Sequence, residues 1–159
     1  MLTRVDTQRP QVQRCARQLP ELHATIYRAL HLLLPDALAR ADCLISSVPG
    51  SADLYLNVLE RHDYTSYLQL TYVFSGSRVQ NPNAYIRIYH DAHMAEATAF
   101  SPEQGIERLA GPGLPVHGQV VRSWRLNRAL VKWLDYLLDQ GHGAATFRPM
   151  DEIPEFLSI

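Results

Sequence analysis

Residues 84–100, AYIRIYHDAHMAEATAF, contain two segments of alternating apolar and polar residues on either side of a polar turn. A period of two is typical of a strand whose two faces meet different surroundings. If the chain turns at Asp91-Ala92, one register places the apolar residues on a single face, with the pairs His90–His93, Ile88–Ala95 and Ile86–Ala97. The stretch therefore predicts an antiparallel hairpin with a flat apolar face on which a helix can pack.

The other face of this hairpin is polar and aromatic. It pairs Arg87 with Glu96 and Tyr85 with Thr98. A directly opposed arginine and glutamate stabilise a sheet by about 0.2–1 kcal/mol. The turn at Asp91-Ala92 lacks the glycine that a tight primed turn prefers, so a wider loop is an alternative.

The same test on residues 53–61 and 65–74 predicts a second hairpin. In the register that we expect, Arg61 lies opposite Thr65 and one face of the hairpin is apolar. The loop then contains three residues, or five residues in the same register. Its predicted pairs are Leu54–Tyr72, Leu56–Leu70 and Val58–Leu68.

Strand signals also occupy the neighbouring segments. The expected strands are 43–48, 53–61, 65–74, 84–90 and 93–100. No helical pattern intervenes, so we expect a meander of four or five antiparallel strands.

Helical periodicity appears before and after the strands. Apolar residues recur at a spacing near 3.6 over residues 10–34, with Pro20 predicting a kink or restart and Pro35 ending the helix. A second helix is predicted over residues 123–140, with Ser123 as its N-cap and Gly141 as its C-cap.

Length and pattern together predict one α+β domain. A chain of 159 residues fits one domain better than two. We expect a flexible N-terminus at residues 1–9, a domain at 10–143 and a tail at 144–159, with residues 101–122 forming a long irregular connection. Both helices should pack on one face of the sheet and leave the tyrosine, arginine and glutamate face partly open.

Composition argues against several classes of protein. Fifteen lysines and arginines against 16 aspartates and glutamates give a net charge of −1, which argues against nucleic-acid binding. No apolar run is long enough to span a membrane, and the first residues do not resemble a signal peptide. Cys15 and Cys43 do not form a disulfide framework and read as small buried residues. We therefore expect a cytoplasmic protein.

The densest polar cluster lies at the turn of residues 89–96. His90, Asp91 and His93 could hold zinc, or the His-Asp pair could orient a general base, whereas the structural interpretation is a plain hairpin tip. No cofactor is predicted apart from this zinc alternative. Arg61-His62-Asp63-Tyr64 repeats the His-Asp pair at the other predicted turn. The two turns could form one patch from His62, Asp63, His90, Asp91 and His93.

Two function hypotheses follow, since no known catalytic motif is present. The first is a non-enzymatic interaction or regulatory module that binds a protein partner, or a second copy of the chain, through Tyr85, Arg87, Tyr89 and Glu96. The alternative is a small-ligand site, nucleotide-like, in which Arg87 binds phosphate and His90 and Asp91 assist. That site needs a concavity beside these residues.

The stretch Tyr85–Ala92 (YIRIYHDA), followed by Ala95-Glu96, resembles the hallmark of the YqiB-like bacterial family of unknown function. Other matching positions are Cys15, Leu32-Leu33-Leu34-Pro35, Glu60, Tyr64-Thr65, Gln119, Leu126-Asn127, Leu130, Trp133-Leu134 and Gly141. The resemblance covers about residues 12–143. It implies a small cytoplasmic bacterial protein, often encoded near nucleotide-metabolising enzymes, with no established reaction. Val121-Arg122-Ser123 replaces a charged run of the family, and His93 is not part of its pattern.

Overall fold

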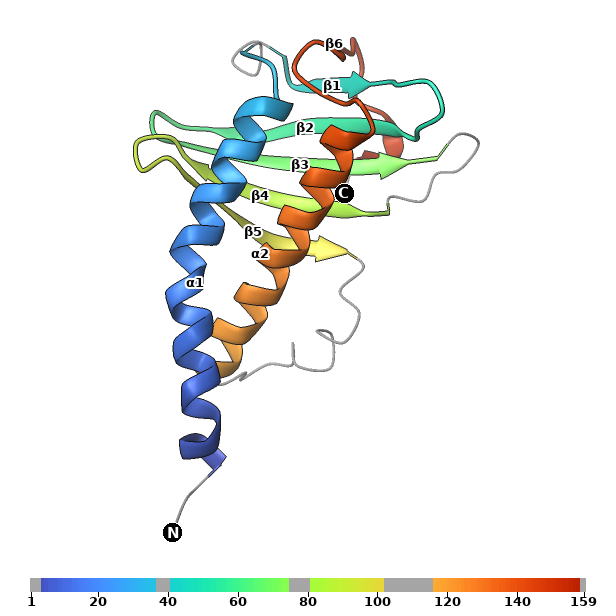
Figure 1. The fold of residues 1–159 in the computed structure, drawn as a ribbon. Helices are drawn as coiled ribbons and strands as arrows, with labels where there is room; N and C mark the ends of the chain where they lie inside the picture. Colours follow the sequence, from blue (N-terminus) through green and yellow to red (C-terminus); the bar gives the residue numbers. More distant parts are fainter. Residues whose placement is uncertain (1–3, 37–40, 75–80, 102–115, 158–159) are drawn as a thin grey trace.

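Six strands form one antiparallel sheet with the order β5-β4-β3-β2-β1-β6, and two helices cover one of its faces (Figure 1). The computed structural model describes residues 4–36, 41–74, 81–101 and 116–157. The elements are α1 (Arg4–Leu33), β1 (Cys43–Ser46), β2 (Asp53–Arg61), β3 (Thr65–Val73), β4 (Asn83–Tyr89), β5 (Met94–Ser101), α2 (Val116–Asp139), β6 (Phe147–Pro149) and the short 3₁₀ helix η3 (Glu155–Leu157). The predicted α+β fold is confirmed.

The hairpin of β2 and β3 has the predicted apolar face. Its pairs are Leu54–Tyr72, Leu56–Leu70 and Val58–Leu68, as expected. The predicted pairing of Arg61 with Thr65 is wrong, because a bulge between Val58 and Glu60 shifts the register and Arg61 pairs with Ser66. A bulge inserts one residue into one strand, so four residues, 62–65, separate the paired Arg61 and Ser66 instead of the predicted three or five.

In the hairpin of β4 and β5, too, the predicted apolar pairs are correct and a bulge shifts the rest of the register. Ile88 pairs with Ala95 and Ile86 with Ala97, as predicted. A second bulge, between Tyr85 and Ile86, places Tyr85 opposite Ala99 instead of Thr98. Residues 90–93 form the turn, so the wider loop is the correct alternative.

Helix α1 is longer than the sequence predicted. It begins at Arg4 instead of residue 10 and continues through Pro20 without a restart. Proline removes one backbone donor, and the ring of Pro20 lies on the exposed side of the helix. The helix ends at Leu33, just before Pro35, as expected.

Helix α2 begins at Val116, so Ser123 is not its N-cap. Instead, the Ser123 carbonyl accepts a hydrogen bond from Asn127 Nδ2 at 2.7 Å. The expected irregular connection therefore ends seven residues early, and its part at 102–115 lies outside the described residues. Gly141 does follow the helix end, with a φ of 101° that favours glycine.

The core lies between the two helices and the sheet. Ile26, Leu30 and Leu33 of α1 and Leu126, Leu130, Leu134 and Leu137 of α2 pack against the alternate residues of the central strands. The helices also pack against each other (Figure 1). Cys15 and Cys43 are free and buried. None of the described helices combines the length and apolarity needed to cross a membrane.

The sequence did not predict β6. This strand, within the expected tail, pairs with β1 and extends the sheet at that edge. It contains only three residues, too few for a period of two to be recognised.

Candidate ligand-binding pocket

A pocket of about 350 Å³ lies between the C-terminal half of α1 and the end of the sheet that carries the β2–β3 and β4–β5 turns. Figure 1 shows both turns at that end. The apolar lining consists of Leu30, Leu34, Pro35, Val58, Leu68 and Ile88. The polar lining consists of Tyr27, His31, Asp36, Arg61, His62, Asp63, Ser66 and His90.

Helical and strand periodicity explain why these side chains meet. Tyr27, Leu30, His31 and Leu34 are spaced three and four residues apart, so α1 presents them on one face. Val58, Leu68 and Ile88 stand on the helix-facing side of three adjacent strands and are buried. They form an apolar floor, whereas the polar residues come mainly from the helix end and the two turns.

Two hydrogen bonds link the turns to each other. His90 Nε2 lies 2.8 Å from Ser66 Oγ, and the His90 amide donates to the Tyr64 carbonyl at 2.8 Å. The His62 amide donates to the Thr65 carbonyl at 2.8 Å and closes the first turn. Imidazoles from both turns are thereby held at one pocket.

The charged groups of the pocket differ in their partners. Arg61 donates to Asp42 Oδ1 at 2.7 Å and also to the Ala41 carbonyl, so its guanidinium is already paired. Asp36 and Asp63 are exposed carboxylates. Within residues 4–36, 41–74, 81–101 and 116–157 neither has an ion-pair partner.

The sequence hypothesis of a shared patch is met in part. His62, Asp63 and His90 line one pocket, but Asp91 and His93 are not among its lining residues. His93 has a φ of 53° and stacks on Tyr27 with ring centroids 5.2 Å apart. The zinc hypothesis for His90, Asp91 and His93 stays a prediction, although the described part of the chain brings no three such ligands together.

Arg87 does not lie beside His90 in the pocket. It alternates with Ile86 and Ile88, which face the helices, so its side chain stands on the opposite face of the sheet. There its guanidinium lies 4.8 Å from the centre of the Tyr67 ring. Tyr67 in turn stacks on Tyr85 at 6.2 Å. Arg87 is therefore not among the residues that line this pocket, and its role in phosphate binding stays a prediction.

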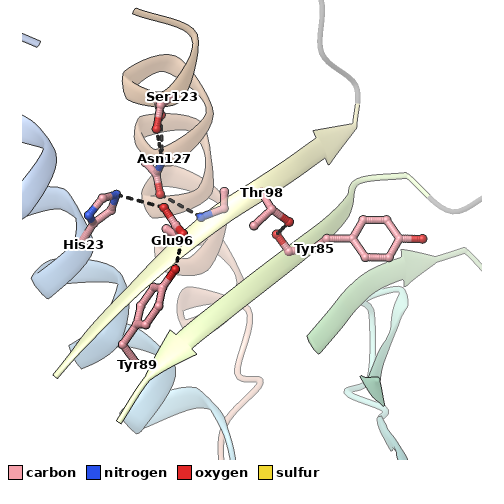
Figure 2. A network of polar contacts seen from close by, with 8 residues as sticks. His23, Tyr85, Tyr89, Glu96, Thr98, Ser123 and Asn127 are labelled. Atoms are coloured by element: carbon pink, nitrogen blue, oxygen red, sulfur yellow. Dashed lines mark hydrogen bonds and ion pairs between the residues drawn. The ribbon is translucent and has the colours of Figure 1, made fainter. Parts of the chain in front are cut away.

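Glu96 lies opposite Arg87 in the sheet, as predicted, but its carboxylate has other partners. It accepts a hydrogen bond from the Tyr89 hydroxyl at 2.6 Å and lies 4.0 Å from His23 Nε2 (Figure 2). Burial, followed by this hydrogen bond, raises the pKa of Tyr89. Burial lowers the pKa of His23, and Glu96 partly opposes that effect.

Sequence reasoning missed the contribution of α1 to the pocket. Tyr27 and His31 share a helix face with the apolar Leu30 and Leu34, which is the one sequence signal for a wall of mixed polarity. Periodicity does not show which strands that wall covers. Asp36 and Ser66 were also missed, because single polar residues at element ends are common.

A second polar cluster is buried at the C-terminal end of α2. His142 is only 2% exposed, and its Nδ1 lies 2.7 Å from Ser46 Oγ. Its Nε2 lies 3.3 Å from Ser51 Oγ and 3.4 Å from the Tyr72 hydroxyl. Burial lowers the pKa of His142, while the Asp53 charge partly opposes this. The cluster anchors the end of α2 to the sheet.

Comparison with known proteins identifies a family without assigning a reaction. Residues 29–143 match the family model described as a protein of unknown function (DUF1249). No curated protein and no solved structure matches the sequence. The narrower YqiB-like assignment stays a prediction. Because the match spans well over half of the residues, the chain belongs to the DUF1249 family.

Proposed function

We propose that this protein is a binding module for a small amphiphilic molecule, held in the pocket between α1 and the two turns. One observation carries the proposal: a pocket of about 350 Å³ has a buried apolar floor beneath a ring of convergent polar groups. This combination is typical of small-molecule sites.

The floor and the ring would act on different parts of the ligand. Leu30, Val58 and Ile88 offer apolar surface to a hydrocarbon or aromatic body, which gains about 25 cal/mol per Å² removed from water. The imidazoles and carboxylates above them offer hydrogen bonds that fix its orientation. An apolar body with one polar end fits this division.

Blocking the pocket provides the test. Ser66 is half-buried, lines the pocket and stands on the helix-facing side of β3, so Ser66→Phe places a ring in the cavity. Thr65→Phe is the matched control, because neighbouring strand residues face opposite sides. Untagged protein would be screened by thermal shift against nucleotides and amphiphilic amines, acids and alcohols. A ligand at 100 times its Kd adds about 2.7 kcal/mol of stability.

The expected result is a hit that Ser66→Phe abolishes and Thr65→Phe retains. Circular dichroism and the melting temperature without ligand establish that both variants fold. A screen with no hit, or hits that bind Ser66→Phe unchanged, contradicts the proposal.

A protein partner at the opposite sheet face is the second candidate. Half-buried Tyr85, Arg87 and Tyr89 lie there, and the Arg87–Tyr67–Tyr85 stack offers a flat aromatic and cationic surface. We place it second because Glu96, the fourth residue expected on this surface, is held by Tyr89 and lies close to His23. Variant Arg87→Ala would lose partner capture if this surface binds a protein. The cytoplasmic location stays a prediction.

A further inference from the structure

We propose that the ligand of this pocket carries a positively charged head group, such as a protonated amine, instead of a phosphate or carboxylate. This inference rests on the proposed function, since it concerns the chemistry of the same site. It departs from the nucleotide-like ligand that the sequence had suggested.

The fixed charges of the pocket favour a cation. Asp36 and Asp63 line the pocket as exposed carboxylates, and no ion-pair partner for either lies in the described chain. Arg61 is the one arginine in the lining, and Asp42 and the Ala41 carbonyl already bind it. A phosphate would therefore meet two like charges and a guanidinium that is already paired.

The end of α1 adds negative potential at the same place. The last carbonyls of a helix lack intrahelical donors and carry a partial negative charge. Here Pro35, four residues after His31, has no amide hydrogen to donate to the His31 carbonyl. Leu34 and Pro35 line the pocket, so this helix end borders it. Cations are favoured at helix C-termini.

The remaining polar groups are suited to an ammonium donor. Each neutral imidazole has one nitrogen that accepts a hydrogen bond. His31 brings this capacity from α1, whereas His90 Nε2 already makes a 2.8 Å hydrogen bond with Ser66 Oγ.

Three probes that share one apolar body and differ in their head groups distinguish the effect of head-group charge from that of apolar contact. We would titrate phenylbutylamine, phenylbutanol and phenylbutyrate into the full-length chain by calorimetry at pH 8, where imidazole is ordinarily neutral. We expect the amine to bind about tenfold more tightly than the alcohol, and the carboxylate to bind most weakly.

Removing the carboxylates tests the cause. Asp36→Asn and Asp63→Asn should each weaken amine binding about threefold and leave alcohol binding unchanged, as expected for exposed charges. Asp91→Asn is the matched control, because Asp91 lies in the neighbouring turn but not in the pocket lining. The losses caused by Asp36→Asn and Asp63→Asn should both become smaller as salt is added.

The outcomes separate the two proposals. If the carboxylate or a nucleotide binds best and Ser66→Phe abolishes that binding, the pocket is a ligand site but the cationic head group is wrong. Equal binding of all three probes, or no effect of the aspartate variants, also overturns the cation inference. If no probe binds, or binding survives Ser66→Phe, the proposed function fails together with it.

Discussion

His90 Nε2, in the turn that follows β4, lies 2.8 Å from Ser66 Oγ of β3, although the two residues are 24 positions apart in the sequence. The register explains the contact. Ser66 pairs with Ile88, and His90 follows two residues later, on the same side as Ile88 and beyond the strand end. The contact holds the β4–β5 turn against the first residues of β3. It thereby fixes one imidazole at the pocket between α1 and the sheet.

Asn127 protects the outer edge of the sheet. Its Oδ1 accepts a hydrogen bond at 2.8 Å from the backbone amide of Ala97 in edge strand β5 (Figure 2). Asn127 is fully buried, so its loss would leave that amide without a partner. We expect Asn127→Ala to lower the free energy of unfolding by about 1–3 kcal/mol.

Chemical denaturation measures this change. Lys132→Ala, an exposed substitution on the same helix, should change stability by no more than about 0.5 kcal/mol. An Asn127→Ala protein as stable as the Lys132→Ala control would show that the edge contact contributes nothing.

Gly141 ends α2 in a backbone conformation that other residues avoid. Its φ is 101°, and an added Cβ would lie 3.4 Å from the Val48 side chain. Gly141→Ala should therefore lower the melting temperature, at a cost of about 1–2 kcal/mol.

Gly143 supplies the comparison two residues later. An added Cβ there meets nothing within 4 Å, and its φ is not in the left-handed region. We expect Gly143→Ala to melt within a few degrees of the parent protein. Equal losses in the two variants would refute the conformational explanation.

The buried imidazole of His142 predicts a loss of stability in acid. Burial lowers its pKa in the folded state, so the unfolded chain binds the proton more tightly. The free energy of unfolding is therefore highest above pH 6.5, the ordinary pKa of histidine, and falls as the pH drops below it. His23, whose pKa is also lowered, contributes with the same sign.

Urea unfolding at pH 8 and pH 5.5 checks this account. His142→Asn should be less stable than the parent at pH 8, because the contacts to Ser46 and Tyr72 are weakened. It should, however, lose less stability than the parent between the two pH values. An unchanged pH dependence would mean that His142 is not a source of the acid sensitivity.

The sequence predicted the sheet well because burial imposes a period of two. The pairs Leu54–Tyr72 and Ile88–Ala95 were correct, since a slip of one residue would turn apolar side chains to the wrong face. The bulges after Val58 and beside Tyr85 were missed, because an inserted residue changes the phase of the alternation only for the few residues that follow it in the strand. The start of α2 was missed because Gly118, inside the helix, was counted in the irregular connection predicted over residues 101–122.

The candidate site was less predictable than the fold. Local sequence placed His62, Asp63 and His90 at two turns, and the fold brings them to one pocket. The sequence did not show that α1 forms the opposite wall with Tyr27 and His31, because that depends on how the helix crosses the sheet. The register predicted from the sequence already placed Arg87 on the face opposite His90, and the alternating burial along β4 agrees with it.

Chemical-shift mapping by NMR tests the central claim most directly. Backbone amide spectra of the full-length chain would be recorded during a titration with phenylbutylamine. The account predicts concentration-dependent shifts at the pocket, above all at His31, Asp63 and His90, and none at Tyr85 or Arg87 on the opposite face. Shifts confined to Tyr85, Arg87 and their neighbours, or no shifts at saturating probe, would contradict it.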